Sequence, residues 1–324
     1  MAIAPPSGIY GAAPRRPAAR ALGRVGIWSS ELRVGDARAL ADQVAELESL
    51  GYGAVWVPGR EGDVFDVART YLQATDRLAV ATGIVSIWLY DAATVAKAAV
   101  ALDDASGGRF VLGLGVSHGP LVNTGSATTG DAAPYRHPLA HMAEYLDQLD
   151  DRLAAAGGPG TPPSVPRLVA ALGPRMLDLA GRRTTGTHPY LVPPEHTAAA
   201  RQRLGAGPVV APCQTVTLAQ GDEARQMLRQ ELATYLRFPN YVDNWRRFGV
   251  TDDDLAGGGS DRLLELLFAW GGEDAVADRV RAHRQAGADH VCVKVLPGPA
   301  SGSGAAPAET PLEEWRRLAP ALTS

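Results

Sequence analysis

The chain has 324 residues, 46% of them hydrophobic, and a formal net charge of −4 from 31 Lys and Arg against 35 Asp and Glu. This near-balanced charge gives no electrostatic basis for binding nucleic acid or an anionic membrane. Two cysteines exclude a disulfide framework and a cysteine zinc site. No apolar run approaches the roughly 20 residues that span a bilayer and no signal peptide is recognisable, so we expect a cytoplasmic protein.

Residues 1–22 are rich in Pro, Ala and Arg without hydrophobic periodicity, which predicts a flexible N-terminal extension before a single domain over residues 23–324. Within that domain, short apolar runs alternate with amphipathic stretches of helical length. Strands are predicted at 23–29, 53–57, 78–89, 110–116, 167–172, 184–192, 208–218 and 290–296. Helices are predicted at 36–50, 64–75, 91–105, 138–155, 175–181, 195–204, 274–287 and 312–322.

Eight strands alternating with helices of crossover length predict an α/β fold of the (β/α)8 TIM-barrel type, which needs about 250 residues. The competing fold, an open doubly wound sheet, carries a G-x-G-x-x-G turn after its first strand, and the sequence GRVGIWSS lacks one. Residues 221–270 have helical character and are too long for one crossover, which predicts a helical insertion after strand seven. Residues 119–137 form a long polar loop, and loops of this length are usually either functional lids or disordered.

The predicted third and fourth strands end in small or polar residues. Ser86 ends the first of these strands, and Gly115, Ser117 and His118 end the second. Because ligands of parallel α/β folds bind at the carboxyl ends of the strands, we expect these residues to line a site. A histidine in this position can donate a hydrogen bond or a proton near neutral pH, which makes His118, and His188 at the end of strand six, candidate catalytic residues.

Two further features have a functional and a structural interpretation. The turn Gly173–Pro174–Arg175–Met176 begins a helix whose free N–H groups favour an anion, although an ordinary strand–helix turn with solvated arginines is the commoner explanation. Alternation along strand eight points Cys292 and Lys294 into the barrel. A lysine buried there can form a Schiff base, although a structural ion pair is commoner. No metal site is predicted.

Four stretches, in this order and spacing, resemble the bacterial luciferase-like superfamily and, within it, the coenzyme F-420-dependent oxidoreductases. They are AELESLGYGAVWV, the segment from Arg77 to His118, GPRMLDLAGRRTTGTHPYLVPPEHTAAAR and GGEDAVADRVRAHRQAGADHVCVKVL. The resemblance implies a flavin or deazaflavin at the barrel mouth, with a non-prolyl cis peptide at Gly83–Ile84 behind its ring. It further implies a phosphate on residues 173–176. It also implies that Ser86, Ser117 and His118 line the ring and its ribityl chain. The cofactor residues implied in this way are Gly83, Ile84, Ser86, Gly115, Ser117, His118, Leu172, Gly173, Pro174, Arg175 and Met176.

Many members of that superfamily carry an acidic residue or a histidine just after strand two, where this chain reads Pro58–Gly59–Arg60–Glu61. The proton donor is therefore absent there or moved to Glu61. We expect hydride transfer between coenzyme F-420 (a deazaflavin) and a small organic substrate, in a homodimer, with His118, His188 or Glu61 supplying the proton.

Three alternatives remain open at this point. One is an FMN-dependent monooxygenase that receives reduced flavin from a partner flavin reductase. The others are a Schiff-base lyase acting through Lys294 and a barrel that binds cofactor without turnover.

Overall fold

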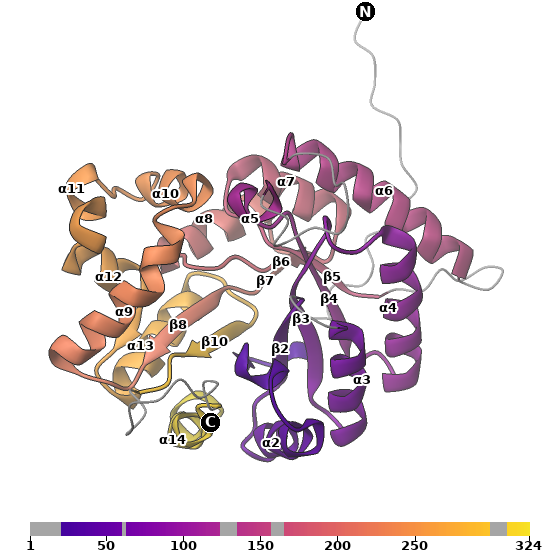
Figure 1. The fold of residues 1–324 in the computed structure, drawn as a ribbon, viewed down its shortest axis with the longest axis horizontal. Coiled ribbons are helices and arrows are strands. Elements are labelled where there is room, and N and C mark those ends of the chain that lie inside the picture. The colour runs from indigo at the N-terminus through magenta and orange to yellow at the C-terminus, as the bar shows by residue number, and fades with distance from the viewer. Residues whose placement is uncertain (1–20, 60–62, 124–134, 157–164, 299–309) are drawn as a thin grey trace, which may run out of the picture.

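The computed structural model describes residues 21–59, 63–123, 135–156, 165–298 and 310–324. One sheet of ten parallel strands has the order β7-β6-β5-β4-β3-β2-β1-β10-β8-β9. The first strand therefore pairs with the last strand of the chain, and the strands form the centre of the molecule in Figure 1. The strands are β1 (Val25–Trp28), β2 (Ala54–Gly59), β3 (Ala79–Ser86), β4 (Phe110–Gly115), β5 (Arg167–Val169), β6 (Gly186–Thr187), β7 (Val209–Val210), β8 (Cys213–Thr217), β9 (Ala269–Trp270) and β10 (Val291–Val295).

The sheet closes into a barrel because β7 and β8 are consecutive parts of one extended segment. β7 pairs with β6, and β8 pairs with β10. Hydrogen bonds continue across the break: the Cys213 N–H donates to the Pro189 carbonyl at 2.8 Å, and the Cys292 N–H donates to the Pro212 carbonyl at 2.9 Å. Counting β7 and β8 as one position and setting β9 aside gives the eight positions of the predicted TIM barrel, which is confirmed.

Prolines explain where the predicted strands are shorter in the structure. Strand seven was predicted as one run over 208–218, but Pro212 has no N–H to give to the ladder and separates β7 from β8. Strand six was predicted over 184–192, and its regular part is only β6, since Pro189 interrupts it. Tyr190 rejoins the sheet through a single bridge to Cys213.

Alternate residues of the strands point into two separate cores. In β10, Val291, Val293 and Val295 join a large apolar cluster between the sheet and the outer helices. Cys292 joins a smaller cluster inside the barrel, where the fully buried Trp56 is the largest side chain. This arrangement confirms the predicted alternation of strand eight.

The outer helices follow the strands as predicted, and α2 begins after Asp36, which caps it. The Asp36 carboxylate accepts a hydrogen bond from the Ala39 N–H at 2.9 Å, so one of the free N–H groups of the first turn is paired. The helices are α2 (Ala37–Ser49), α3 (Val64–Ala74), α4 (Ala92–Ser106), α6 (Pro138–Ala156), α7 (Pro174–Arg183), α8 (Pro194–Leu204), α13 (Glu273–Gln285) and α14 (Leu312–Leu322), with a 3-10 turn, η1 (Glu31–Arg33), after β1.

The predicted insertion is helical and packs around an apolar cluster that includes Leu232, Phe238 and Trp245. Its helices gather at one side of the barrel in Figure 1, and the segment ends in β9 rather than in a helix, because Ala269 and Trp270 pair with β8. They are α9 (Gly221–Tyr235), α10 (Pro239–Arg246), α11 (Asp252–Leu255), η2 (Ala256–Gly258) and α12 (Asp261–Leu267).

Parts of the predicted extension and loops lie outside the described residues. These are residues 1–20, 124–134 and 157–164. Leu22, assigned to the extension from sequence, is fully buried inside the barrel, and the polar loop starts with a short helix, α5 (Gly119–Asn123). In the part of the chain that the structure describes, no helix combines the length and apolar character needed to cross a membrane.

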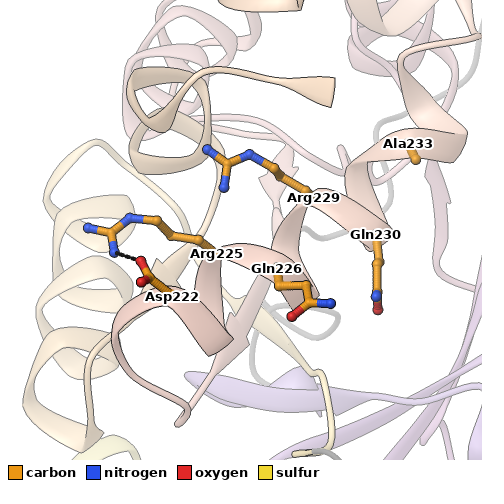
Figure 2. Close-up of a pocket in the computed structure, with 6 residues that line it drawn as sticks. All are labelled: Asp222, Arg225, Gln226, Arg229, Gln230 and Ala233. Atoms are coloured by element: carbon orange, nitrogen blue, oxygen red, sulfur yellow. Dashed lines mark hydrogen bonds and ion pairs between the residues drawn. The ribbon is translucent and has the colours of Figure 1, made fainter. Parts of the chain in front are cut away.

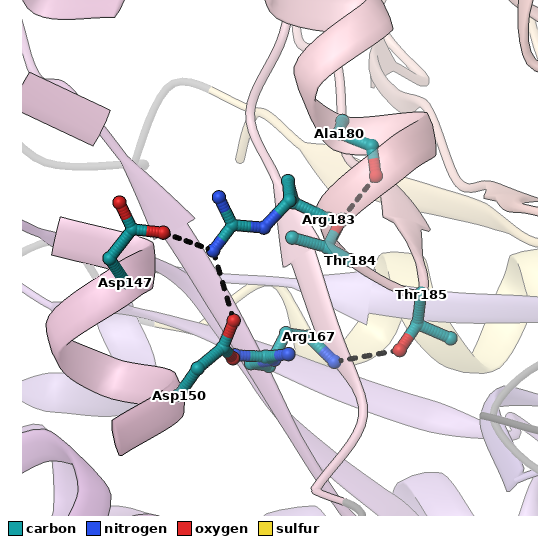
Figure 3. A network of polar contacts seen from close by, with 7 residues as sticks. All are labelled: Asp147, Asp150, Arg167, Ala180, Arg183, Thr184 and Thr185. Carbon is teal, nitrogen blue, oxygen red and sulfur yellow. Dashed lines mark hydrogen bonds and ion pairs between the residues drawn. The ribbon is translucent and has the colours of Figure 1, made fainter. Parts of the chain in front are cut away.

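A polar network fastens α6 to β5 and α7 (Figure 3). The Asp150 carboxylate of α6 contacts Arg167 of β5 and lies 3.0 Å from Arg183 of α7. Asp147, one turn earlier, contacts Arg183 at 2.6 Å but is largely exposed. The network holds in place the strand and helix whose connecting turn was predicted to bind phosphate.

Candidate active site

A cavity of about 440 Å³ lies at the carboxyl ends of the barrel strands, between the barrel and the insertion. Its barrel side comes from the ends of β1 to β6, from the start of β8 and from β10, and its other side comes from α9 and α10. Most of the predicted site residues line it together, although they are far apart in sequence. They are Gly83, Ile84, Ser86, Gly115, Ser117, His118, Leu172 and His188.

The β3 bulge forms one wall of this cavity. The peptide bond between Gly83 and Ile84 is cis, as the resemblance implied, and the pairing of β3 with β4 shifts register at this point. The Trp28 indole N–H donates to the Gly83 carbonyl at 2.8 Å. A Cβ on Gly83 would lie 2.5 Å from the Trp28 nitrogen, and one on Gly115 would lie 2.5 Å from the Ile84 side chain. Trp28 and Ile84 thus fill the space that side chains at these glycines would need. The two glycines contribute only backbone to the cavity wall, and a flat ring fits against such a surface.

The residues at the end of β4 lie against the insertion. Ser117 has a φ of 54° and precedes His118. The His118 ring stacks on Phe238 with centroids 4.3 Å apart and planes 12° apart. The imidazole is therefore held at the cavity wall by a residue that follows α9.

His188 is neutral and arranged to accept a hydrogen bond. Its Nδ1 lies 2.8 Å from the Ala211 carbonyl, which can only accept, so the tautomer is assigned with the proton on Nδ1 and a lone pair on Nε2. The ring stacks on Trp56 at 4.0 Å, and burial lowers the pKa of His188 to about 4. At neutral pH this geometry does not suit the proton-donating role expected from sequence. Glu61, the third predicted catalytic residue, lies outside the described residues.

Lys294 takes part in a hydrogen-bonded cluster at the cavity wall. Its ammonium lies 2.6 Å from Glu231 Oε1 of α9 and 3.3 Å from the Tyr190 hydroxyl. The Tyr190 hydroxyl donates to the same carboxylate oxygen at 2.7 Å and accepts from the Thr215 hydroxyl at 3.1 Å. Glu231 was not foreseen, since nothing in the helical pattern of the insertion distinguishes it from a solvated glutamate.

The family model described as luciferase-like monooxygenase matches residues 21–290. The chain belongs to this luciferase-like family. The match confirms the resemblance on which the sequence interpretation relied.

Two relatives and one solved structure show what this luciferase-like chain is similar to. It is 33% identical over 158 residues to a Mycobacterium tuberculosis protein named as a coenzyme F-420-dependent oxidoreductase, covering 48% of this chain and 41% of that one. It is 27% identical over 186 residues to 5,10-methylenetetrahydromethanopterin reductase of Methanolobus tindarius, covering 50% and 55%. The chain thus spans about half the length of these relatives. The fold matches the coenzyme F-420-dependent tetrahydromethanopterin reductase of Methanopyrus kandleri with a TM-score of 0.69 and 18% identity, over 91% of this chain and 97% of that one.

A second cavity of the luciferase-like barrel, about 540 Å³, adjoins the first through Leu172. Helix α7 begins here with Gly173 as an N-cap that has no side-chain partner. Pro174 at its first position has no N–H, so the N–H groups of Arg175 and Met176 are the ones available to an anion. A Cβ on Gly173 would lie 3.8 Å from the Arg247 guanidinium. Asn244 is fully buried, and within the described residues its Nδ2 has no hydrogen-bond acceptor. A free helix start, a cation and an unpaired donor fit a phosphate.

The other residues of the predicted phosphate turn occupy different positions. Pro174 lines the second cavity, whereas Arg175 is exposed and Met176 packs against the apolar clusters. Arg247 and Asn244 were missed from sequence, because they belong to the insertion, and only the fold brings them to the start of α7.

A separate groove lies on the outward face of α9, away from the β3 bulge and the start of α7 (Figure 2). Its charges are satisfied within the chain: Arg225 lies 3.1 Å from Asp222 and 3.3 Å from Asp261, which Arg229 also contacts. No group of three His, Cys, Asp or Glu side chains in the described ranges is placed to hold a metal ion.

Proposed function

We propose that this protein is a coenzyme F-420-dependent oxidoreductase that transfers a hydride between the deazaflavin and a small organic substrate. The observation that carries the proposal is the pair of adjoining cavities, with the Gly83–Ile84 bulge in one and the α7 start with Arg247 in the other. The names of the relatives from Mycobacterium tuberculosis and Methanolobus tindarius support the same chemistry.

Each part of the cavity has a task in this proposal. The backbone at Gly83 and Ile84 would back the ring, and Ser86 and Ser117 would border it. Gly173, Asn244 and Arg247 would hold the phosphate. When bound, the deazaflavin supplies the hydride chemistry. The aromatic side chains Tyr235, Phe238 and Tyr241 of the insertion would exclude water from the reacting atoms.

Titration of the purified protein with F-420 and with FMN tests the proposal. We expect tight F-420 binding that weakens at least ~10-fold in Arg247→Ala, since a charged hydrogen bond contributes roughly 1.5–3 kcal/mol. Arg225→Ala, on the outer groove, is the matched control and should bind F-420 like wild type. Tight FMN binding without F-420 binding would reject this cofactor.

The second candidate is an FMN-dependent monooxygenase, which the name of the matching family favours. This enzyme would need reduced flavin from a partner reductase. Oxygen consumption on addition of chemically reduced FMN and a substrate would support it, whereas F-420-linked turnover under anaerobic conditions would reject it.

The expected homodimer and cytoplasmic location stay predictions. Light scattering of the purified chain and fractionation of the source cells would test them.

A further inference from the structure

The Lys294 ammonium is enclosed by groups from three parts of the fold. Glu231 of α9 and Tyr190 beyond β6 bind it at 2.6 and 3.3 Å. The Trp28 ring of β1 lies beneath it, with the centroid 5.1 Å from Nζ, and the Tyr190 ring lies at 5.6 Å. Both aromatic faces attract a cation. The nitrogen is thereby fixed next to the indole that binds the Gly83 carbonyl at the ring-binding bulge.

One N–H of this ammonium makes no hydrogen bond to a described residue. An ammonium group has three donors, and Glu231 and Tyr190 accept two of them. Among the described residues no acceptor meets the third. Lys294 lines the first cavity with 13% of its side chain exposed, so the third donor is accessible to a bound molecule but mostly shielded from solvent.

The surroundings keep Lys294 charged and so argue against the Schiff-base alternative. Burial opposes the charge, but the combined interactions with Glu231 and Tyr235 outweigh it and raise the pKa of Lys294. A Schiff base needs the free amine as nucleophile. An amine that is protonated at neutral pH is instead a hydrogen-bond donor, and it can pass its proton to a stronger base such as an alkoxide oxygen.

The charge of the described cavity lining sets the class of molecule that it receives. Lys294 and Glu231 are its only Asp, Glu, Lys or Arg side chains, and their charges cancel. An anionic or cationic substrate would find no uncompensated partner among the described lining residues, and burying an unpaired charge is unfavourable. Aromatic rings and small apolar groups make up much of the remaining wall, so a neutral, mostly apolar molecule with one oxygen acceptor fits best.

We propose that Lys294 binds the oxygen of a neutral carbonyl substrate and donates the proton that its reduction requires. The proposal rests on the proposed function, in which reduced F-420 supplies the hydride. The carbonyl carbon gains the hydride, the C=O π bond breaks, and the oxygen takes one proton from the ammonium to become a hydroxyl. Lys294 is left as a neutral amine and regains a proton from water. Alcohol oxidation follows the same steps in reverse. Glu231 and Tyr190 are positioning residues.

The two lysines of the chain allow a direct test without knowledge of the natural substrate. Protein labelled with ¹³C,¹⁵N-lysine gives two side-chain signals, from Lys294 and from the exposed Lys97 of α4, and Lys97→Arg assigns them. We expect cyclohexanone, with and without bound F-420, to shift the Lys294 signal alone. Methylcyclohexane, of similar size and without an oxygen, should leave it in place. An unmoved Lys294 signal up to the solubility limit of the ketone would overturn the proposal, as would equal shifts with the hydrocarbon.

Kinetics on the F-420-loaded protein give a second, independent readout. With a neutral ketone that wild type reduces, Lys294→Met should lower kcat by ~100-fold or more, as expected for loss of a general acid, without changing F-420 affinity. Lys294→Arg keeps a charged donor and should recover part of the rate. In Glu231→Gln the ammonium loses its counter-ion, so the alkaline limit of activity should move to lower pH. Full activity of Lys294→Met would overturn the assignment.

The two proposals fail in different ways. Absence of F-420 binding by wild type rejects the proposed function. The ketone titration then still tests whether a carbonyl oxygen contacts the Lys294 ammonium. F-420 binding with an unmoved Lys294 signal rejects only the role of this lysine.

Discussion

Single residues at the cavity show what position along the chain can and cannot predict. Ser86 and Ser117 were predicted because they end apolar strands, and the ends of parallel strands meet at one edge of the barrel. Gly83 was implied by the resemblance to the luciferase-like superfamily. Glu231 and Arg247 were not predicted, because their positions at the cavities depend on how the insertion packs against the barrel. His188 was located correctly, but its bond to the Ala211 carbonyl fixes the tautomer, and no local pattern reveals that partner.

Gly83 should tolerate no side chain. In Gly83→Ala the new Cβ would lie 2.5 Å from the Trp28 nitrogen, so either the indole or the bulge must move. We expect a loss of roughly 1–3 kcal/mol in the free energy of unfolding and at least ~10-fold weaker F-420 binding. Urea unfolding and fluorescence titration measure the two effects.

Gly298→Ala is the matched control, because a Cβ there meets no atom of the described residues within 4 Å. It should change the free energy of unfolding by less than about 0.5 kcal/mol. Equal, small effects in both variants would show that the contact between Gly83 and Trp28 does not constrain the bulge.

At the scale of elements, the strands and outer helices follow from hydrophobic periodicity, and the exceptions have local causes. Pro212 divides strand seven because it has no N–H. The pairing of Ala269 and Trp270 as β9 could not be predicted, since two residues are too short to show alternation and their partner strand is distant in sequence. The helical character of the insertion was predictable, whereas its contacts with the barrel were not.

The attachment of α6 to the barrel should depend on Asp150 and not on Asp147. Asp150 forms ion pairs with two arginines, and its side chain is 13% exposed. Its partner on β5, Arg167, is 16% exposed. Asp150→Ala leaves the partly buried Arg167 without its carboxylate, so we expect a loss of about 2 kcal/mol in the free energy of unfolding. Thermal unfolding at neutral pH measures it.

Asp147→Ala provides the comparison within the same helix. Asp147 is 65% exposed and contacts Arg183, which keeps Asp150 as a partner. The expected loss is below about 0.5 kcal/mol, as for other exposed ion pairs. If both variants lost the same stability, the network would not act through the buried carboxylate.

At the scale of the whole molecule, four buried histidines should make the fold sensitive to acid. Burial lowers the pKa of His188 and His196 to about 4 and that of His283 and His290 to about 3, from 6.5. Between these values and 6.5 the unfolded chain binds more protons than the folded one, so the free energy of unfolding falls as pH is lowered below 6.5. By pH 5, each histidine lowers the free energy of unfolding by on the order of 2 kcal/mol. The four losses together approach the whole stability of an ordinary domain.

His290 allows this effect to be isolated. In its neutral form Nε2 accepts the Trp56 indole N–H at 3.1 Å and Nδ1 lies 3.1 Å from the Gly23 carbonyl, so protonation breaks the bond to Trp56. Glutamine offers the same acceptor and donor but does not titrate. We therefore expect His290→Gln to be less stable than wild type at pH 7 and to regain about 2 kcal/mol relative to wild type at pH 5. Urea unfolding across this range measures the difference, and the exposed His137, replaced in the same way, should give a curve parallel to wild type. Parallel curves for both variants would mean that His290 does not contribute to the acid sensitivity, and the origin would then lie in the other three buried rings or in the carboxylates.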